Sequence, residues 1–123
     1  MKTIYYANKA LNHFTKVEQC QQPEGLYLAL FTEEPGRYAP YKGEVENYTR
    51  QKVSFAPSDN GISRSSEAIV FPKLPNVTIK YWGLYDALTG GNLLEYFKLQ
   101  FDWVIAPGVE KEIGAGDLII REE

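Results

Sequence analysis

The sequence predicts a mainly β protein: one antiparallel β-sandwich or partly open barrel of about seven or eight short strands, with a single amphipathic helix at the N-terminus. Three observations predict this fold. Helical periodicity is confined to residues 1–20. From residue 25 onward, short apolar or alternating segments follow one another with Gly, Pro and Asn between them. No helical segment separates the later strands, which argues against a parallel sheet. The 123 residues fit one domain, 1–123, with a helix over 1–20 and a β-domain over 25–123.

The N-terminal segment carries an apolar residue at every third or fourth position, which is the spacing of one helix face. These residues are Ile4, Ala7, Leu11, Phe14 and Val17. Thr3 precedes the segment as a candidate N-cap, and a stretch with Pro and Gly follows its expected end near Gln19. We therefore expect an amphipathic helix that packs its apolar face against another surface.

The first expected strand is 26–32, an almost continuous apolar run bounded by turn residues, which is typical of a strand buried on both faces. Residues 33–48 follow as a long loop without periodicity, and a loop of this length is either functional or mobile. Residues 49–55 alternate apolar and polar side chains, as an edge or half-exposed strand does. An Asn-Gly pair in the segment 57–61 then indicates a tight turn.

The remaining strands are separated by turns rich in Gly, Pro and Asn. Residues 67–71 form a strand that Pro72 is expected to stop. Residues 77–85 carry large apolar side chains on both faces, so this strand is expected in the middle of a sheet. A turn at 86–92 joins it to its hairpin partner. That partner is expected at 93–99, residues 104–105 precede a turn at 106–108, and the last short strands are expected at 109–113 and 117–121.

Charge and composition argue against several classes of function. The net charge is -3 and the 13 Lys and Arg residues do not cluster, which argues against binding to nucleic acid. No apolar run approaches the roughly 20 residues that a membrane helix needs, and the start of the chain shows no secretory signal. The single Cys20 and the single His13 rule out an internal disulfide and argue against a zinc site. We expect no metal and no cofactor.

Enzyme sites make the most specific demands, and the sequence meets none of them well. The only imidazole, His13, lies on the expected helix, and a pair of His13 with Cys20 would span the helix end without any feature that lowers the thiol pKa. Two carboxylates for glycoside hydrolysis could come from the long loop and the later turns, but a chain with 16 acidic residues offers many such pairs. We therefore expect no enzymatic activity.

Aromatic residues are 14% of the chain, and most of them fall within the expected strands, where they would build the core. Four rings remain as candidates for contact with a partner protein or a glycan: Tyr38, Tyr41 and Tyr48 in the long loop, and Trp103 beside a turn. Such amphipathic rings suit protein interfaces and sugar stacking. The alternative is that these rings pack the loop onto its own sheet.

A structural ion pair is a further candidate. Arg50 lies on the half-exposed strand and Asp86 begins the hairpin turn, where its carboxylate can accept backbone N–H bonds. A forked hydrogen bond from Arg50 to Asp86 or to Glu46 would fix the long loop to the sheet.

Several segments resemble, in order along nearly the whole chain, a family of small structural proteins of tailed phages that are often called tail fiber proteins. The most specific pieces are Tyr48-Thr49-Arg50-Gln51 and the run Asp86-Ala87-Leu88-Thr89-Gly90-Gly91-Asn92-Leu93-Leu94. The opening Ala7-Asn8-Lys9-Ala10-Leu11 and the closing Ala115-Gly116-Asp117-Leu118-Ile119 also match. The chain departs from the family pattern at 73–80 and in the loop 33–48, which is richer in Tyr and charge.

The resemblance implies a non-enzymatic component of the virion tail, such as a tail fiber or a protein of the tail tip or baseplate, made in the cytoplasm of a bacterial host. It implies assembly with other phage tail proteins and a homo-oligomer, with a trimer as the expected form by analogy with other fibers. The alternative function is recognition of host-surface polysaccharide through Tyr38, Tyr41 or Trp103. A glycosidase that acts on capsule is a third hypothesis.

Overall fold

The computed structural model describes residues 1–19 and 22–121, which form one helix and eight strands. The elements are α1 (Ile4–Phe14), β1 (Leu26–Phe31), β2 (Gln51–Val53), β3 (Ile62–Arg64), β4 (Ile69–Leu74), β5 (Val77–Tyr85), β6 (Leu93–Ile105), β7 (Val109–Ile113) and β8 (Ile119–Arg121). The fold is mainly β with a helix near the N-terminus, as the sequence predicts.

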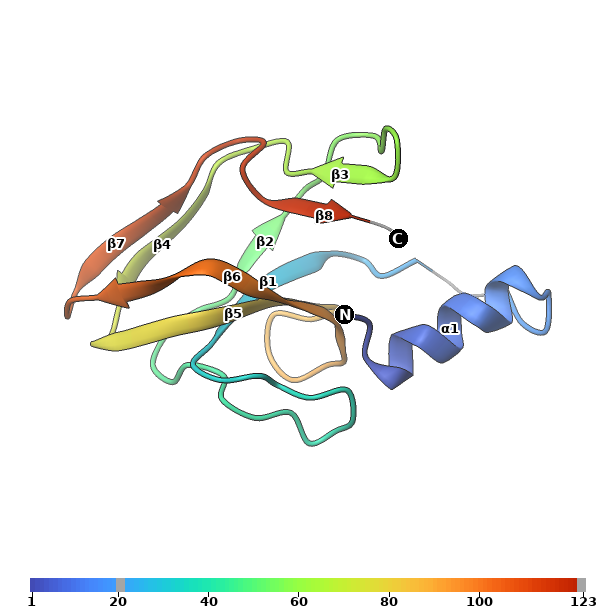
Figure 1. The fold of residues 1–123 in the computed structure, drawn as a ribbon, viewed down its shortest axis with the longest axis horizontal. Helices are drawn as coiled ribbons and strands as arrows, with labels where there is room; N and C mark the ends of the chain where they lie inside the picture. Colours follow the sequence, from blue (N-terminus) through green and yellow to red (C-terminus); the bar gives the residue numbers. More distant parts are fainter. Residues whose placement is uncertain (20–21, 122–123) are drawn as a thin grey trace.

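The strands form three antiparallel sheets. The largest has the order β2-β1-β5-β6, and the ribbons β3-β8 and β4-β7 have two strands each. Strand β5 lies between β1 and β6, which confirms the prediction that 77–85 runs through the middle of a sheet. In Figure 1 the two ribbons lie on one side of the four-stranded sheet, and the long loop after β1 lies on the other side.

The main core fills the space between the four-stranded sheet and the two ribbons. It combines buried apolar side chains of β1, β2, β4, β5, β6 and β7 with Val45 and Leu118. A second, smaller core lies on the opposite face of the sheet, where Ala29, Phe31, Tyr85, Leu93 and Tyr96 pack together. The four-stranded sheet is therefore covered on both faces.

Strand β1 shows why its sequence is a nearly unbroken apolar run. Leu28 and Leu30 belong to the main core, whereas Ala29 and Phe31 belong to the second core. Because successive side chains of a strand point to opposite faces, every residue in this stretch is buried. The strand opposite it has Gly83 paired with Ala29, and a Cβ atom at Gly83 would lie 2.8 Å from Leu93 Cδ1.

Helix α1 is shorter than the expected 1–20. It begins after Thr3, whose hydroxyl accepts a hydrogen bond from the Tyr6 N–H, and it ends at Phe14, just before Lys16 adopts a φ of 63°. A non-glycine residue in this left-handed region cannot continue a right-handed helix. Cys20 lies outside the described residues.

The residues before α1 pair with the edge of β6. The Thr3 N–H donates to Leu94 O at 2.9 Å, and the Tyr96 N–H donates to Met1 O at 3.0 Å. The Thr3 hydroxyl also donates to Leu93 O at 2.7 Å. These bonds fix the start of α1, but none of its residues is buried. The first turn of α1 contacts β6 and its Ile4 and Ala7 are half-buried, whereas Leu11 and Phe14 farther along the apolar face are exposed.

Two further strand predictions are corrected. Strand β4 runs through Pro72 to Leu74, and its pairing with β7 shifts register between Phe71 and Leu74. A proline lacks the N–H that a regular ladder needs, and such an irregularity tolerates it. Strand β6 continues past the expected end at residue 99 to Ile105. Strand β3 was not expected, because its three residues are too few to show a periodicity.

Candidate functional site

The long loop is held to the sheet by a charged cluster centred on Arg50. The guanidinium donates from Nε to Glu44 Oε2 and from Nη2 to Glu44 Oε1, each at 2.8 Å. Its Nη1 donates to the backbone oxygens of Ala87 and Gly90, each at 2.9 Å. The side chain is only 8% exposed, and its Cζ lies 3.5 Å from the centre of the Tyr85 ring. Arg50 therefore joins the loop, strand β5 and the hairpin turn.

Tyr48 completes this cluster. Its hydroxyl donates to the Glu44 carboxylate and accepts a hydrogen bond from the Leu30 N–H of β1 at 3.1 Å. Burial and the hydrogen bond to Glu44 raise the pKa of Tyr48. The ring also packs 6.2 Å from the ring of Phe71, centre to centre. Tyr48 thus links the loop to both layers of the fold.

The electrostatics of the cluster favour the ion pair. Burial raises the pKa of Glu44, but the hydrogen bonds from Arg50 and Tyr48 and the positive charge of Arg50 outweigh it, so that the pKa lies below its ordinary value. Burial, with a contribution from the Glu44 charge, raises the pKa of Tyr85 to about 12. The cluster is therefore an ionised carboxylate and guanidinium between two neutral phenols at neutral pH.

The partner of Arg50 differs from the sequence prediction. The predicted partners were Asp86 and Glu46, but Asp86 accepts hydrogen bonds from the backbone N–H and the side-chain Nδ2 of Asn92, at 2.7 and 3.1 Å. Glu46 is exposed. Glu44 takes their place because it pairs with Phe31 as an isolated β-bridge, which holds its side chain beside Arg50. The sequence contains no signal for this bridge, since the loop lacks strand periodicity.

The four candidate rings have different environments. Tyr38 is 65% exposed, whereas Tyr41 packs against the second core. Tyr48 belongs to the Arg50 cluster. Trp103 lies within β6 and not beside a turn; its ring packs against the main core, and Lys111 Nζ lies 4.5 Å from its centre. Tyr38 is therefore the most accessible of the four rings for a partner.

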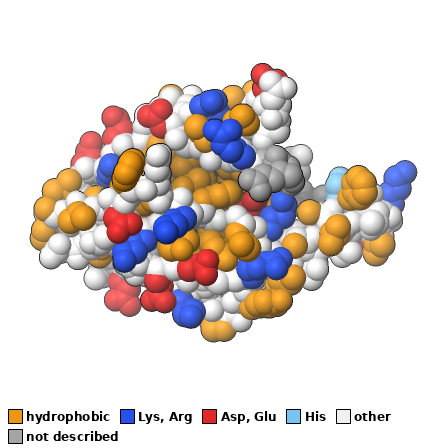
Figure 2. All heavy atoms as spheres, in the orientation of Figure 1, with side chains coloured by type: hydrophobic (Ala, Val, Ile, Leu, Met, Phe, Trp, Pro, Cys, Tyr) orange, Lys and Arg blue, Asp and Glu red, His pale blue; other side chains and the backbone are white. Residues whose placement is uncertain are grey.

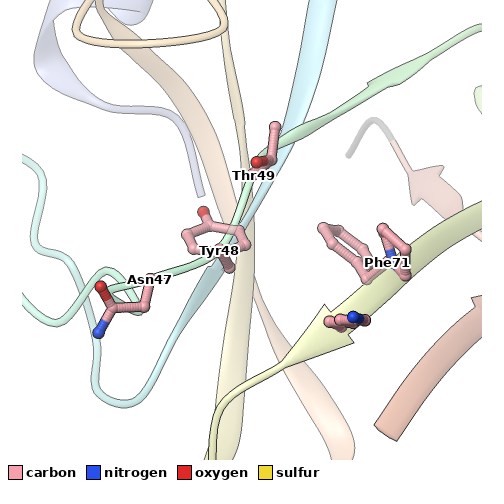
Figure 3. A pocket seen from close by; sticks show the side chains of 6 residues that line it. Asn47, Tyr48, Thr49 and Phe71 are labelled. Carbon is pink, nitrogen blue, oxygen red and sulfur yellow. The ribbon is translucent and has the colours of Figure 1, made fainter. Parts of the chain in front are cut away.

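An open hollow of about 510 Å³ lies between the chain at 47–49 and strand β4 (Figure 3). It is lined by Asn47, Tyr48, Thr49, Phe71, Pro72 and Lys73. The lining combines the aromatic rings of Tyr48 and Phe71 and the ring of Pro72 with amide, hydroxyl and ammonium groups. The lining contains no pair of carboxylates.

Exposed apolar side chains gather at one end of the molecule along α1. We call this group the helix stripe; it consists of Leu11, Phe14 and Val17. Phe14 is 84% exposed, which is unusual for so large an apolar side chain. The periodicity of the sequence identifies these residues, although it does not show that they stay uncovered.

Three further apolar side chains are exposed along the end of β6 and at the start of β7: Phe101, Val104 and Val109. Val104 is 80% exposed, and the Val109 N–H donates to Ala106 O, which holds the two sides of the turn together. The sequence does not predict their exposure, because alternation in a strand does not reveal which face another layer covers.

Within residues 1–19 and 22–121, no group of three or more His, Cys, Asp or Glu side chains could hold a metal ion. His13 is exposed on α1. In the same described residues, no helix is both long and apolar enough to cross a membrane.

The sequence matches a protein family described as "Podophage GP4 fiber I protein gp80" over residues 2–121. A search of curated proteins found no match.

Proposed function

The chain belongs to the podophage GP4 fiber I protein gp80 family, and from this premise we propose that it is a non-enzymatic building block of the phage tail that works by protein–protein assembly. The single observation that carries this proposal is the family match, which extends from residue 2 to residue 121. The proposal places the protein in the virion tail, in a homo-oligomer, with a trimer as the expected form, and in contact with other tail proteins.

The design of the Arg50 cluster supports a structural role. Arg50 donates two hydrogen bonds to the Glu44 carboxylate and two to backbone carbonyls of the hairpin turn. The Tyr48 hydroxyl donates a further hydrogen bond to Glu44. A fully bonded cluster of this kind fixes a loop and leaves little capacity for proton transfer to a substrate. The loop is thereby given one conformation, which a subunit that must fit its neighbours requires.

The uncovered apolar surfaces support assembly. Large exposed apolar groups at defined places on a small protein are typical of interaction sites. The helix stripe is one such place, and it lies on a helix whose start is hydrogen-bonded to β6.

Gold-labelled antibodies against the chain, applied to purified virions of the phage that encodes it, test this function. Electron micrographs are expected to show gold on the tail in several copies per virion. Virions that contain no chain by quantitative mass spectrometry, although infected cells produce it, would refute the proposal.

Binding of host-surface polysaccharide is the second candidate function. It is favoured by the exposed ring of Tyr38 and by the hollow beside Tyr48, whose ring the hydrogen bonds of its hydroxyl hold in place. Host polysaccharide is then expected to raise the melting temperature of the purified chain. The Tyr38→Ala variant distinguishes the ring of Tyr38 from the hollow. If the polysaccharide no longer raises its melting temperature, binding is assigned to Tyr38. If the melting temperature rises in neither the variant nor the natural chain, carbohydrate binding is contradicted.

A further inference from the structure

The hollow between the chain at 47–49 and strand β4 has one aromatic ring that the fold holds in place. The Tyr48 hydroxyl is hydrogen-bonded to Glu44 and to the Leu30 N–H, and the Tyr48 ring packs against Phe71. Figure 3 shows Tyr48 and Phe71 on the two sides of this hollow. Because the ring of Tyr48 is already fixed, a ligand that stacks on it does not have to immobilise it, which favours binding.

Strand β4 turns two successive side chains toward solvent beside the hollow. Phe71 and Leu74 are buried, but Pro72 and Lys73 between them are both exposed, whereas a regular strand would alternate. The cause is the shift in the register with β7 between Phe71 and Leu74. Such irregularities redirect side chains and are over-represented beside functional sites. The shift thereby brings the ring of Pro72 and the ammonium group of Lys73 into the lining of the hollow.

The opposite wall contains a second backbone irregularity. Asn47 has a φ of 59°, in the left-handed region that few residues other than Gly adopt. Residues in such conformations cluster at ligand-binding places. Asn47 and Thr49 are exposed and line the hollow, one on each side of Tyr48 in the sequence. This wall combines a fixed ring with amide and hydroxyl groups, which suits a sugar, since a sugar has a C–H face that stacks and hydroxyls that form hydrogen bonds.

The lining of the hollow is positively charged. Lys73 contributes an ammonium group, and none of the described residues that line the hollow carries a carboxylate. The chain as a whole has a net charge of -3, and Figure 2 shows basic and acidic side chains interspersed over the face that it draws. The field of the whole molecule therefore does not attract an anion, and attraction of an anion to the hollow depends on the local ammonium group.

We propose that this hollow binds a sugar that carries a carboxylate, such as a uronic acid of an acidic surface polysaccharide. The inference rests on the carbohydrate-binding candidate above, and it names the class of ligand and its place on the chain. The C–H face of the sugar ring stacks on Tyr48 and Pro72. The sugar hydroxyls face Asn47 and Thr49, and the carboxylate pairs with Lys73.

Removal of the charge from each partner in turn tests this pairing. The ligand is polysaccharide extracted from the surface of the bacterium that the phage infects, in its native form and after reduction of its carboxylates to alcohols, which keeps every sugar linkage. The protein variants are Lys73→Gln and Lys73→Arg. Lys80→Gln is the matched control, because Lys80 is an exposed lysine of β5 outside the lining. All three substitutions are at exposed positions, so the natural melting temperature is expected.

Isothermal titration calorimetry measures the affinity of each protein for each form of the polysaccharide. The natural chain and the Lys80→Gln control are expected to bind the native form about fivefold more tightly than the reduced form, which is the upper end for an exposed ion pair. Lys73→Gln is expected to bind the two forms equally, and Lys73→Arg is expected to keep the preference. This comparison measures the coupling between the ammonium group and the carboxylate, which a loss of structure would not produce.

A preference for the native form that persists in Lys73→Gln would overturn the hollow as the place of binding. Equal binding of the two forms by the natural chain would overturn the acidic sugar as the ligand, while carbohydrate binding itself would stand. Binding of neither form refutes this inference together with the carbohydrate-binding candidate, whereas the gold-labelling experiment decides separately whether the protein is a tail component.

Discussion

Replacing Arg50 with Met tests the role of the charged cluster most severely, because it removes the fork and keeps most of the aliphatic side chain against Tyr85. The substitution deletes two hydrogen bonds to Glu44 and two to the backbone oxygens of Ala87 and Gly90. It also leaves the Glu44 carboxylate without its counter-ion.

The expected loss follows from the burial of the two partners. Removing one partner of a buried ion pair typically costs about 3–5 kcal/mol. Arg50 is 8% exposed, but the Glu44 side chain is 28% exposed and regains some hydration, so the lower end applies. We expect the free energy of unfolding to fall by about 3 kcal/mol and the melting temperature by about 12 °C, at roughly 4 °C per kcal/mol for a chain of this size.

Urea unfolding followed by tryptophan fluorescence measures this change. The matched control is Arg64→Met, because Arg64 is exposed and makes a single 3.4 Å bond to Gly116 O. It is expected to change the free energy of unfolding by less than about 0.5 kcal/mol. An Arg50→Met protein as stable as the Arg64→Met protein would refute the reasoning.

Three further predictions concern the same fold. The pKa of Glu44 is lower in the folded than in the unfolded chain, so its contribution to the free energy of unfolding is present above the ordinary value of 4.5 and is lost as the pH falls through the folded pKa. Glu44→Gln is therefore expected to flatten the decline of stability at acidic pH. A decline as steep as that of the natural chain contradicts this prediction. Tyr48→Phe removes a hydroxyl that hydrogen-bonds both Glu44 and the Leu30 N–H, and we expect the free energy of unfolding, measured with urea, to fall by about 1–3 kcal/mol. An unchanged free energy of unfolding would refute the hydrogen bonding described. Gly83→Ala places a methyl group 2.8 Å from Leu93 Cδ1 and 3.1 Å from the Glu95 backbone oxygen. It is expected to lower the free energy of unfolding by about 1–3 kcal/mol. An unchanged free energy of unfolding would show that the surrounding atoms move aside without cost.

Much of the fold could be predicted from local pattern. The run of apolar residues at 26–32 predicted a strand buried on both faces, and Leu28 and Phe31 lie in the two different cores. The predicted turn at 86–92 is present because Asp86 binds Asn92 across it. Features that depend on neighbouring residues in the sequence were therefore visible.

Features that depend on distant residues were not visible. The passage of β4 through Pro72 depends on the register of β7, and the choice of Glu44 over Glu46 depends on a single bridge to Phe31. The exposed stripe of α1 also follows from tertiary structure, since periodicity shows that a helix has an apolar face but does not show what covers it.

The most direct test of assembly as the function of this protein is a cryo-electron microscopy map of the intact tail at side-chain resolution. The map is expected to show several copies of the two-layer fold in the fibers, each with Phe14 buried against a neighbouring copy. Fibers without this fold, or copies of it that touch no other protein, would contradict the account.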